Sequence, residues 1–142
     1  MAIKQLSAFV ENKPGTLLAM LKALADAGIN IRAMSIADTR DFGILRLIVS
    51  DVEKAANVLE HNSIVTTTDV LAVEMRDEAG ALSNILSALG EANINIEYLY
   101  AFTARTERGA YVVFRVDDNE AAERVLQAHS IATLSEAEIA AI

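Results

Sequence analysis

The first part of the chain alternates between two spacings of apolar residues. Residues 3–10 mix apolar and polar positions in a short run that ends in Phe and Val, which is typical of a strand. Pro14 then stands where a helix begins, because the N–H that proline lacks has no partner in a first helical turn. Gly28 ends this helix, since glycine adopts the left-handed conformation at little cost. One face of the helix carries Leu17, Met20, Leu21, Leu24 and Ala27.

The pattern then becomes extended, returns to a helix and becomes extended again. Residues 44–49, Ile-Leu-Arg-Leu-Ile-Val, form the least ambiguous strand in the sequence. Asp51 is placed to cap the next helix, and residues 64–68 are β-branched. The first half therefore predicts the order βαββαβ. Its expected strands cover 3–10, 29–38, 44–49 and 64–68, a hairpin connects the middle pair over 39–43, and the second helix covers 52–61.

The second half repeats the first. Residues 14–31 align with 79–96 at an offset of 65, with nine identities in 18 positions. Past the first hairpin the offset becomes 67, which matches Asp51 with Asp118 and Ile64 with Ile131. The second hairpin, around 103–109, is thus two residues longer.

The join between the repeats is tight. The strand over 64–68 runs almost directly into a strand over 70–75, with no Gly/Ser/Pro linker between them. We therefore predict two domains, 2–69 and 70–142, held in a fixed mutual pose. After the second repeat, Ser135 and Glu138 fit a capping box that opens a short terminal helix.

Composition narrows the class of protein. Hydrophobic residues make up 53% of the chain, enough for a core, although a unit of about 70 residues buries only about 60% of its unfolded surface and gains from a neighbour. The net charge of −8 argues against nucleic acid and against anionic membranes as partners. The sequence has no apolar run long enough to span a bilayer, no signal-peptide pattern and no cysteine. We expect a soluble cytoplasmic protein.

Candidate site residues recur at one spacing. Eighteen residues separate Asn12 from Asn30, and eighteen separate Asp77 from Asn95. In both copies a glycine, Gly15 or Gly80, precedes a helix whose free N–H groups suit an anion. On the residues alone, tight turns explain both glycines better than a ligand does, and the asparagines are equally explained as helix terminators.

Two motifs of the first repeat resemble the ACT domain, a small regulatory module of amino-acid metabolism. They are Asn12-Lys13-Pro14-Gly15-x-Leu17 and Gly28-Ile29-Asn30-Ile31. The second copy departs from the pattern at Asp77, Ala79 and Asn93. The resemblance implies an α+β fold: two tandem ferredoxin-like βαββαβ units that pair into a continuous antiparallel sheet of eight strands with helices on one face. No catalytic domain is attached, so a stand-alone tandem ACT protein is expected.

The same resemblance implies a free amino acid bound at the seam between the repeats. Asn12 would face Asn95 across one pocket, and Asp77 would face Asn30 across the other. The Asp77 carboxylate repels an α-carboxylate, so this second pocket is expected to be the weaker one. Val10 and Met75 stand where serine-sensing members have a histidine, so serine specificity is not supported. The residues that the resemblance assigns to the ligand are Asn12, Pro14, Gly15, Leu17, Asn30, Ile31, Asp77, Gly80, Asn95 and Ile96.

Signals of catalysis are missing from the sequence. It has no cysteine nucleophile, G-x-S-x-G turn, Walker loop or G-x-G-x-x-G motif, and two histidines are too few for a typical zinc or nickel site. No catalytic residue, metal or cofactor is therefore expected. We expect a homodimeric sensor that binds a free amino acid and modulates a partner enzyme of amino-acid metabolism. The alternative is a regulatory subunit that docks on an enzyme without any ligand.

Overall fold

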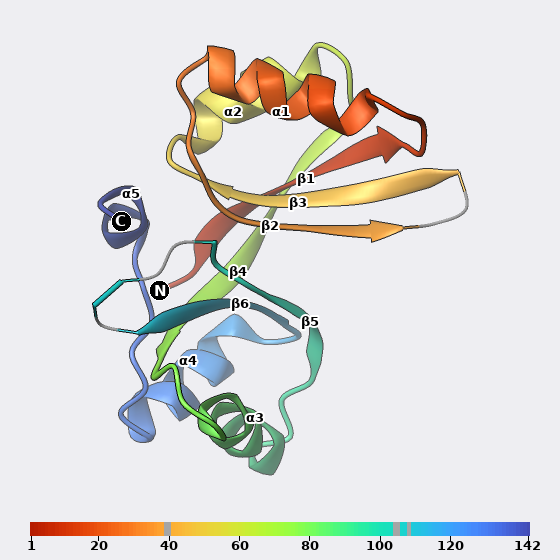
Figure 1. Cartoon of the computed structure of the whole chain (residues 1–142). Coiled ribbons are helices and arrows are strands. Elements are labelled where there is room, and N and C mark those ends of the chain that lie inside the picture. Colours follow the sequence, from red (N-terminus) through yellow and green to blue (C-terminus); the bar gives the residue numbers. More distant parts are fainter. Residues whose placement is uncertain (39–40, 104–105, 108) are drawn as a thin grey trace. The chain divides into compact units, whose positions relative to one another are not determined.

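A computed structural model describes residues 1–38, 41–103, 106–107 and 109–142. The described strands form one six-stranded sheet, as the predicted continuous sheet requires, and the chain divides into two compact units that each have their own helices (Figure 1). The first unit is Lys4–Thr68, and the second is Asp69–Ile142 together with Met1–Ile3.

The first unit is a sheet with two helices. Its strands lie in the order β2-β3-β1-β4, and β3 is antiparallel to both β1 and β2. Register pairs Leu6 with Leu47 between β1 and β3, and Met34 with Leu47 between β2 and β3. The elements are β1 (Ile3–Glu11), α1 (Thr16–Asp26), β2 (Ile31–Asp38), β3 (Phe42–Val49), α2 (Val52–Glu60) and the start of β4 (Val65–Met75).

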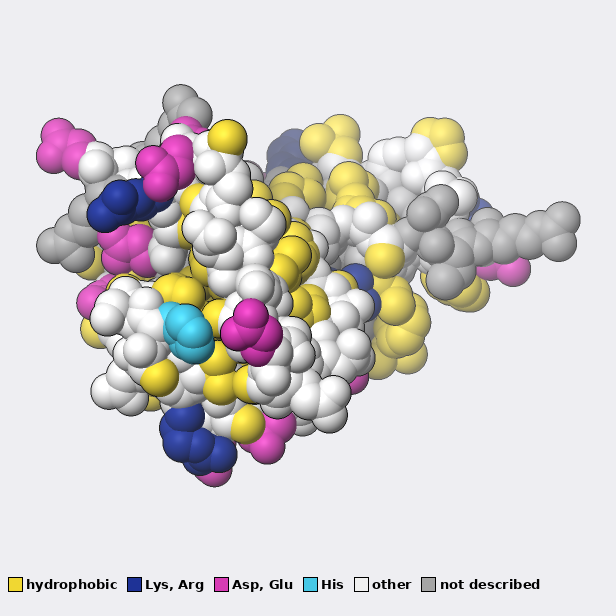
Figure 2. Space-filling view, turned by 90° about the horizontal axis from the view of Figure 1, so that it is seen from below, with side chains coloured by type: hydrophobic (Ala, Val, Ile, Leu, Met, Phe, Trp, Pro, Cys, Tyr) yellow, Lys and Arg dark blue, Asp and Glu magenta, His cyan; other side chains and the backbone are white. Residues whose placement is uncertain are grey.

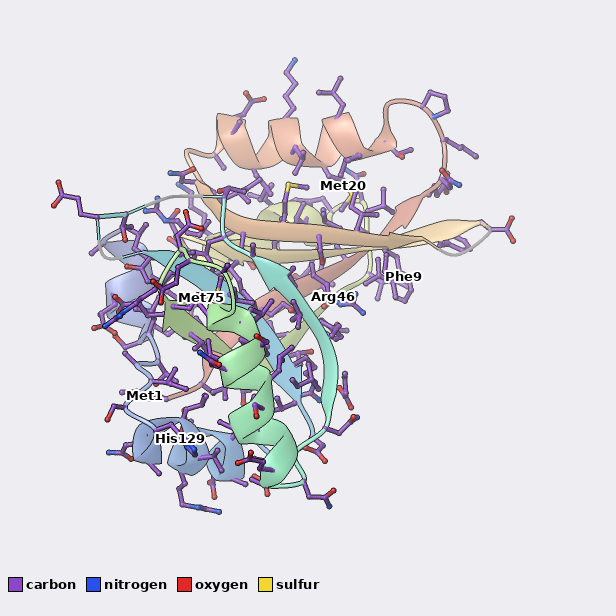
Figure 3. All side chains as sticks on the ribbon, turned by 60° about the horizontal axis from the view of Figure 1, so that its bottom comes forward. Met1, Phe9, Met20, Arg46, Met75 and His129 are labelled. Atoms are coloured by element: carbon purple, nitrogen blue, oxygen red, sulfur yellow. The ribbon has the colours of Figure 1, made fainter. Side chains whose placement is uncertain are left out.

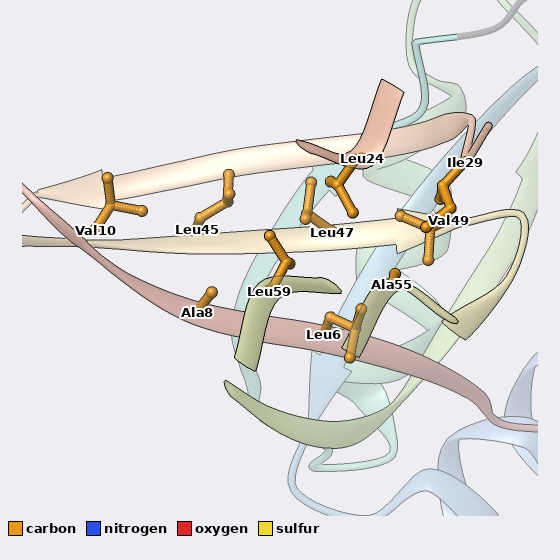
Figure 4. Close-up of a cluster of buried hydrophobic side chains, with 10 residues drawn as sticks. All are labelled: Leu6, Ala8, Val10, Leu24, Ile29, Leu45, Leu47, Val49, Ala55 and Leu59. Carbon is orange, nitrogen blue, oxygen red and sulfur yellow. The ribbon is translucent and has the colours of Figure 1, made fainter. Parts of the chain in front are cut away.

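Both helices of this unit contribute to one core (Figure 4). Met20 lies between α1 and the sheet, whereas Phe9 and Arg46 lie on the opposite face (Figure 3). The predicted apolar face of α1 is confirmed, because Leu24 is fully buried and the other four residues pack around it. The buried members are Leu6, Ala8, Val10, Leu24, Ile29, Leu45, Leu47, Val49, Ala55 and Leu59.

The second unit repeats this architecture. Its strands lie in the order β4-β6-β5, with β6 antiparallel to both neighbours, and residues 132–134 run beside β4 through a bridge from Val73 to Thr133. Its separate core includes Leu71, Val73 and Phe114. The elements are the rest of β4, α3 (Ala81–Glu91), β5 (Ile96–Ala101), β6 (Ala110–Val116), α4 (Asn119–Ala128) and α5 (Glu136–Ala140).

The strand count differs from the implied eight. Six strands are formed in the described part of the chain. The strands predicted over 64–68 and 70–75 are one continuous strand, β4, because Asp69 continues the extended backbone. The last strand of the second repeat shortens to the bridge at Thr133.

Helix ends follow the local chemistry that the sequence predicts. The Asp51 carboxylate accepts the Lys54 N–H, and Asp118 accepts the Ala121 N–H in the equivalent helix. Gly28 takes the left-handed conformation with φ of 73°, and Asn93 takes it with φ of 59° at the matching place. Ser135 forms the predicted capping box with Glu138.

Several boundaries differ from the sequence prediction. Helix α1 begins at Thr16 rather than at Pro14, because Gly15 has φ of 85° and cannot belong to a right-handed helix. Strand β3 begins at Phe42, two residues before the predicted start. The two predicted hairpins include residues 39–40, 104–105 and 108, which lie outside the described residues. Within the described chain, none of the helices has both the length and the apolar character needed to cross a membrane.

Candidate functional site

The loop between β1 and α1 is built by local hydrogen bonds. Gly15 has φ of 85°, a conformation that residues with a side chain rarely adopt, and it turns the chain into α1. The Thr16 hydroxyl lies 2.6 Å from the carbonyl oxygen of Glu11 and 2.9 Å from that of Lys13. The Asn12 N–H donates to the carbonyl of Asp41 (3.1 Å), which ties the loop to the β2–β3 connection. The loop therefore has a defined conformation.

A cavity of about 160 Å³ lies against this loop. Asn12 and Leu17, both predicted site residues, line it together with Ile36 and Gly43 from the β2–β3 hairpin. Its volume lies below the 300–1,000 Å³ typical of small-molecule sites, so it has room for the head group of an amino acid rather than for a large ligand.

The start of α1 favours negative charge beside this cavity. The first N–H groups of a helix have no carbonyl one turn earlier, and they carry the positive end of the helix dipole. Among the described residues, no side chain caps α1 at Gly15 or α3 at Gly80. Both helix starts thus keep N–H groups that suit a carboxylate.

The two asparagines occupy matching positions after the first helix of each unit. The Asn30 N–H donates to Ser50 Oγ (3.0 Å), and the Asn95 N–H donates to Asp117 Oδ1 (3.2 Å). In both repeats the strand register shifts directly after the asparagine, between Ile31 and Ala33 and between Ile96 and Tyr98. Such bulges redirect side chains and recur next to functional sites.

Within one unit, the loop and the asparagine are far apart. Helix α1 separates Asn12 from Asn30, and its 11 residues span about 16 Å at 1.5 Å per residue. Asn12, Pro14 and Gly15 are exposed in the loop, as is Asn30 at the other end. Leu17 is half-buried against the core of the first unit. Neither unit therefore brings all of its own predicted residues to one place.

The counterpart loop in the second unit has different chemistry. Gly80 keeps the left-handed conformation, with φ of 88°, but Ala81 replaces Thr16 and removes the hydroxyl that fixes the first loop. Here Ser83 Oγ donates to the carbonyl of Gly80 (2.9 Å). Asp77 is exposed, and Ile96 is half-buried against the second core.

Sequence reasoning missed a larger cavity in the second unit. It has a volume of about 480 Å³, and its lining includes Arg76, Glu78 and Asn84. A signal for it was present, because polar residues replace apolar ones at aligned positions: Glu74 stands where the first repeat has Phe9, and Asn84 where it has Ala19.

Charged side chains of the described residues form no metal-binding group. No three His, Asp or Glu side chains come together as a metal-binding group in the part of the chain that the structure describes. On the face shown in Figure 2, acidic and basic side chains are interspersed. His129 stands at the end of α4, where its ring Nδ1 lies 2.9 Å from the carbonyl oxygen of Val125 (Figure 3).

This repeated architecture identifies the family. Residues 1–142 match the family model described as an ACT domain pair, and the chain belongs to that family. This membership confirms the predicted fold of two βαββαβ repeats. No curated protein matches the chain.

Solved structures share the fold. Protein BT0572 from Bacteroides thetaiotaomicron is 36% identical, with a TM-score of 0.92 over 100% of this chain and 98% of that chain. The regulatory subunit of aspartate kinase from Thermus thermophilus, in its ligand-free form, is 17% identical, with a TM-score of 0.64 over 88% of this chain and 91% of that one. The corresponding subunit from Thermus flavus is also 17% identical, with a TM-score of 0.60 over 88% and 90%.

Proposed function

We propose that this protein is a regulatory amino-acid sensor that modulates an enzyme of amino-acid metabolism. The observation that carries the proposal is the cavity at the start of α1, where Asn12 stands beside helix N–H groups that no described side chain caps. A carboxylate is favoured at such a helix start, and the Asn12 amide can donate to a carboxylate or accept from an ammonium. Regulatory subunits of aspartate kinase have the same fold, which supports a regulatory role.

The remaining part of the site is proposed from the family resemblance. We assign the other end of the ligand to Asn95, with Asp77 and Asn30 forming a second and weaker pocket. The carboxylate of Asp117 next to Asn95 is available to an α-ammonium, which supports the assignment. Asn12→Ala and Asn95→Ala test it, because each substitution should weaken the binding of the same amino acid when both side chains contact one ligand. Unchanged affinity in Asn95→Ala would contradict a shared ligand.

A thermal-shift panel of the twenty free amino acids tests the sensor function. A ligand at 100 times its dissociation constant stabilises the folded state by about 2.7 kcal/mol, which raises the melting temperature by about 5–10 °C in a protein of this size. Asn12→Ala should reduce that rise. Asn57→Ala is the matched control, because Asn57 is also exposed in the first unit but lies on α2. No rise with any of the twenty would refute amino-acid sensing.

One observation favours ligand-independent docking as a second candidate. Phe9 and Phe42 keep 48% and 49% of their surface exposed on the first unit. Exposed apolar residues of this size mark protein contacts when they form a patch. Affinity purification from the native host, with and without amino acids, separates the two functions. A stoichiometric enzyme that is lost in Phe9→Ser, and whose capture is indifferent to every amino acid, supports docking alone.

A further inference from the structure

The large cavity of the second unit has a smaller counterpart in the first. The large cavity measures about 480 Å³ and is formed by the end of β4, the loop into α3, the first turns of α3 and residues 130–132. The cavity of the first unit measures about 230 Å³. Six lining positions of the two cavities coincide at the offset of 65 that relates the repeats. The two cavities therefore occupy equivalent places in the two repeats, and the one in the second repeat is larger.

A slip of one residue accompanies the difference in size. In the first unit, the Phe9 N–H donates to the carbonyl of Ile64 (3.2 Å). In the second, the equivalent Glu74 N–H donates to the carbonyl of Ala132 (2.9 Å), rather than to that of Ile131, the residue that the sequence alignment matches with Ile64. The two acceptor residues, Ile64 and Ala132, are 68 positions apart, whereas the sequence alignment uses an offset of 67. The hydrogen bonds therefore differ from the alignment by one residue.

The slip has a local cause at the end of α4. This helix has 10 residues, one more than α2, and it ends in Ser130 with the left-handed φ of 57°. The Ile131 N–H then donates to the carbonyl of Leu126 (2.9 Å), which closes the helix end.

The longer helix also removes a hydrogen bond across the cleft. In the first unit, Ser63 Oγ donates to the carbonyl of Phe9 (2.6 Å) and joins the two sides. After the slip, Ile131 takes the place of Ser63 and has no hydroxyl to make this bond. The second unit therefore lacks this side-chain hydrogen bond beside its wider cleft.

The wider cleft has both signs of charge on its lining. Arg76 stands where the first repeat has Glu11, Glu78 comes from the same loop, and Asn84 projects from α3 where the first repeat has Ala19. Arg76 is exposed. Ile85 and Ile131 supply an apolar part of the lining. The cavity falls within the 300–1,000 Å³ typical of small-molecule sites.

We propose that this cleft binds a free α-amino acid in its zwitterionic form, at a second ligand site contained in one repeat. The Arg76 guanidinium pairs with the α-carboxylate, and the Glu78 carboxylate pairs with the α-ammonium. Asn84 adds a hydrogen bond to either group, and the ligand side chain packs on Ile85. A simple anion would meet the Glu78 carboxylate, and a simple amine would meet the Arg76 guanidinium, so the zwitterion fits best. The site is independent of the loop site around Asn12.

Amide chemical shifts of the whole protein locate any binding. Each of the twenty free amino acids is added in turn to uniformly ¹⁵N-labelled protein. At least one should shift the amides of Asn84, Ser130 and Ile131 in a saturable manner. Its N-acetyl and carboxamide derivatives, which each lack one charge, should not. Shifts confined to residues 12–17 and 95 would support the loop site and overturn the cleft site. Shifts confined to the cleft would support the cleft site and count against the loop site.

Two substitutions test the lining, each introducing the residue of the first repeat. Arg76→Glu should weaken binding at the cleft by about tenfold or more, because it replaces a charge-assisted bond with repulsion. Asn84→Ala should weaken it by several-fold. Arg124→Glu is the matched control, since Arg124 is an exposed arginine of the same unit on α4. Equal affinity in Arg76→Glu and the unchanged protein would refute the proposal, as would a panel without any shift at the cleft.

Discussion

Gly109 and Gly15 both have positive φ, but for different structural reasons. Gly109 has φ of 134°, and a Cβ added to it would clash with the carbonyl oxygen of Met75. Gly15 has φ of 85° and open space around its Cα. The first glycine allows a close approach of two backbone segments, whereas the second only supplies a left-handed turn.

Alanine at the two positions should therefore have unequal effects. Gly15→Ala should cost about 1 kcal/mol, the penalty for a left-handed residue with a side chain. Gly109→Ala should cost several-fold more, because the backbone of Met75 must move as well. Urea unfolding of the two variants measures both values. Equal losses would show that the segment around Gly109 relaxes freely.

At the same scale, the sequence predicted the loop residues but not the cleft residues. Asn12 and Gly15 belong to a contiguous motif that occurs twice, and the family resemblance assigns this motif to the ligand, so their binding role stays a prediction. Arg76 and Ser130 come from segments 54 residues apart, and they share a cavity only because of the fold. Such pairs cannot be read from local patterns.

At the scale of the element, the caps of α2 and α4 are a matched pair. Asp51 accepts the Lys54 N–H at 3.1 Å, and Asp118 accepts the Ala121 N–H at 3.0 Å. Each satisfies one of the N–H groups that a helix start leaves without a partner.

Removing either cap should destabilise the protein by a similar amount. Asp51→Ala and Asp118→Ala should each cost about 1 kcal/mol. Asp51→Asn and Asp118→Asn should change stability little, because asparagine caps about as well as aspartate. Thermal and urea unfolding of the four variants provides the comparison. A loss in the asparagine variants as large as in the alanine variants would contradict a capping role.

Elements were predictable where a local signal defines them. The order βαββαβ, the caps and the left-handed Gly28 follow from spacing and turn chemistry. The exact offset after α4 cannot be predicted in this way. It depends on one extra residue in α4, a helix that ends before the left-handed Ser130. An alignment by identity therefore keeps Ile131 opposite Ile64, although the hydrogen bonds select Ala132.

At the scale of the whole molecule, β4 is common to both units. Its 11 residues run from Val65 to Met75, with residues 65–68 in the first unit and 69–75 in the second. Loss of the first unit therefore removes one end of a strand on which the second unit depends.

This shared strand predicts cooperative unfolding. Leu24→Ala, a fully buried change in the first unit, should cost about 2–5 kcal/mol. It should also lower the hydrogen-exchange protection of β6 amides in the second unit. Leu18→Ala is the control on the same helix, because Leu18 is 69% exposed. Unchanged protection in β6 would show that the units unfold separately.

The continuity of β4 also governs which insertions the chain tolerates. Successive side chains of a strand point to opposite faces, and Leu71 and Val73 belong to the core of the second unit. One extra residue after Asp69 would move both side chains to the other face unless the strand bulged. The sequence of the second repeat is two residues longer than that of the first between its two middle strands, where extra residues leave the register of the core strands unchanged. No loop interrupts β4 at the junction, so an insertion of even one residue there changes which face the following side chains occupy.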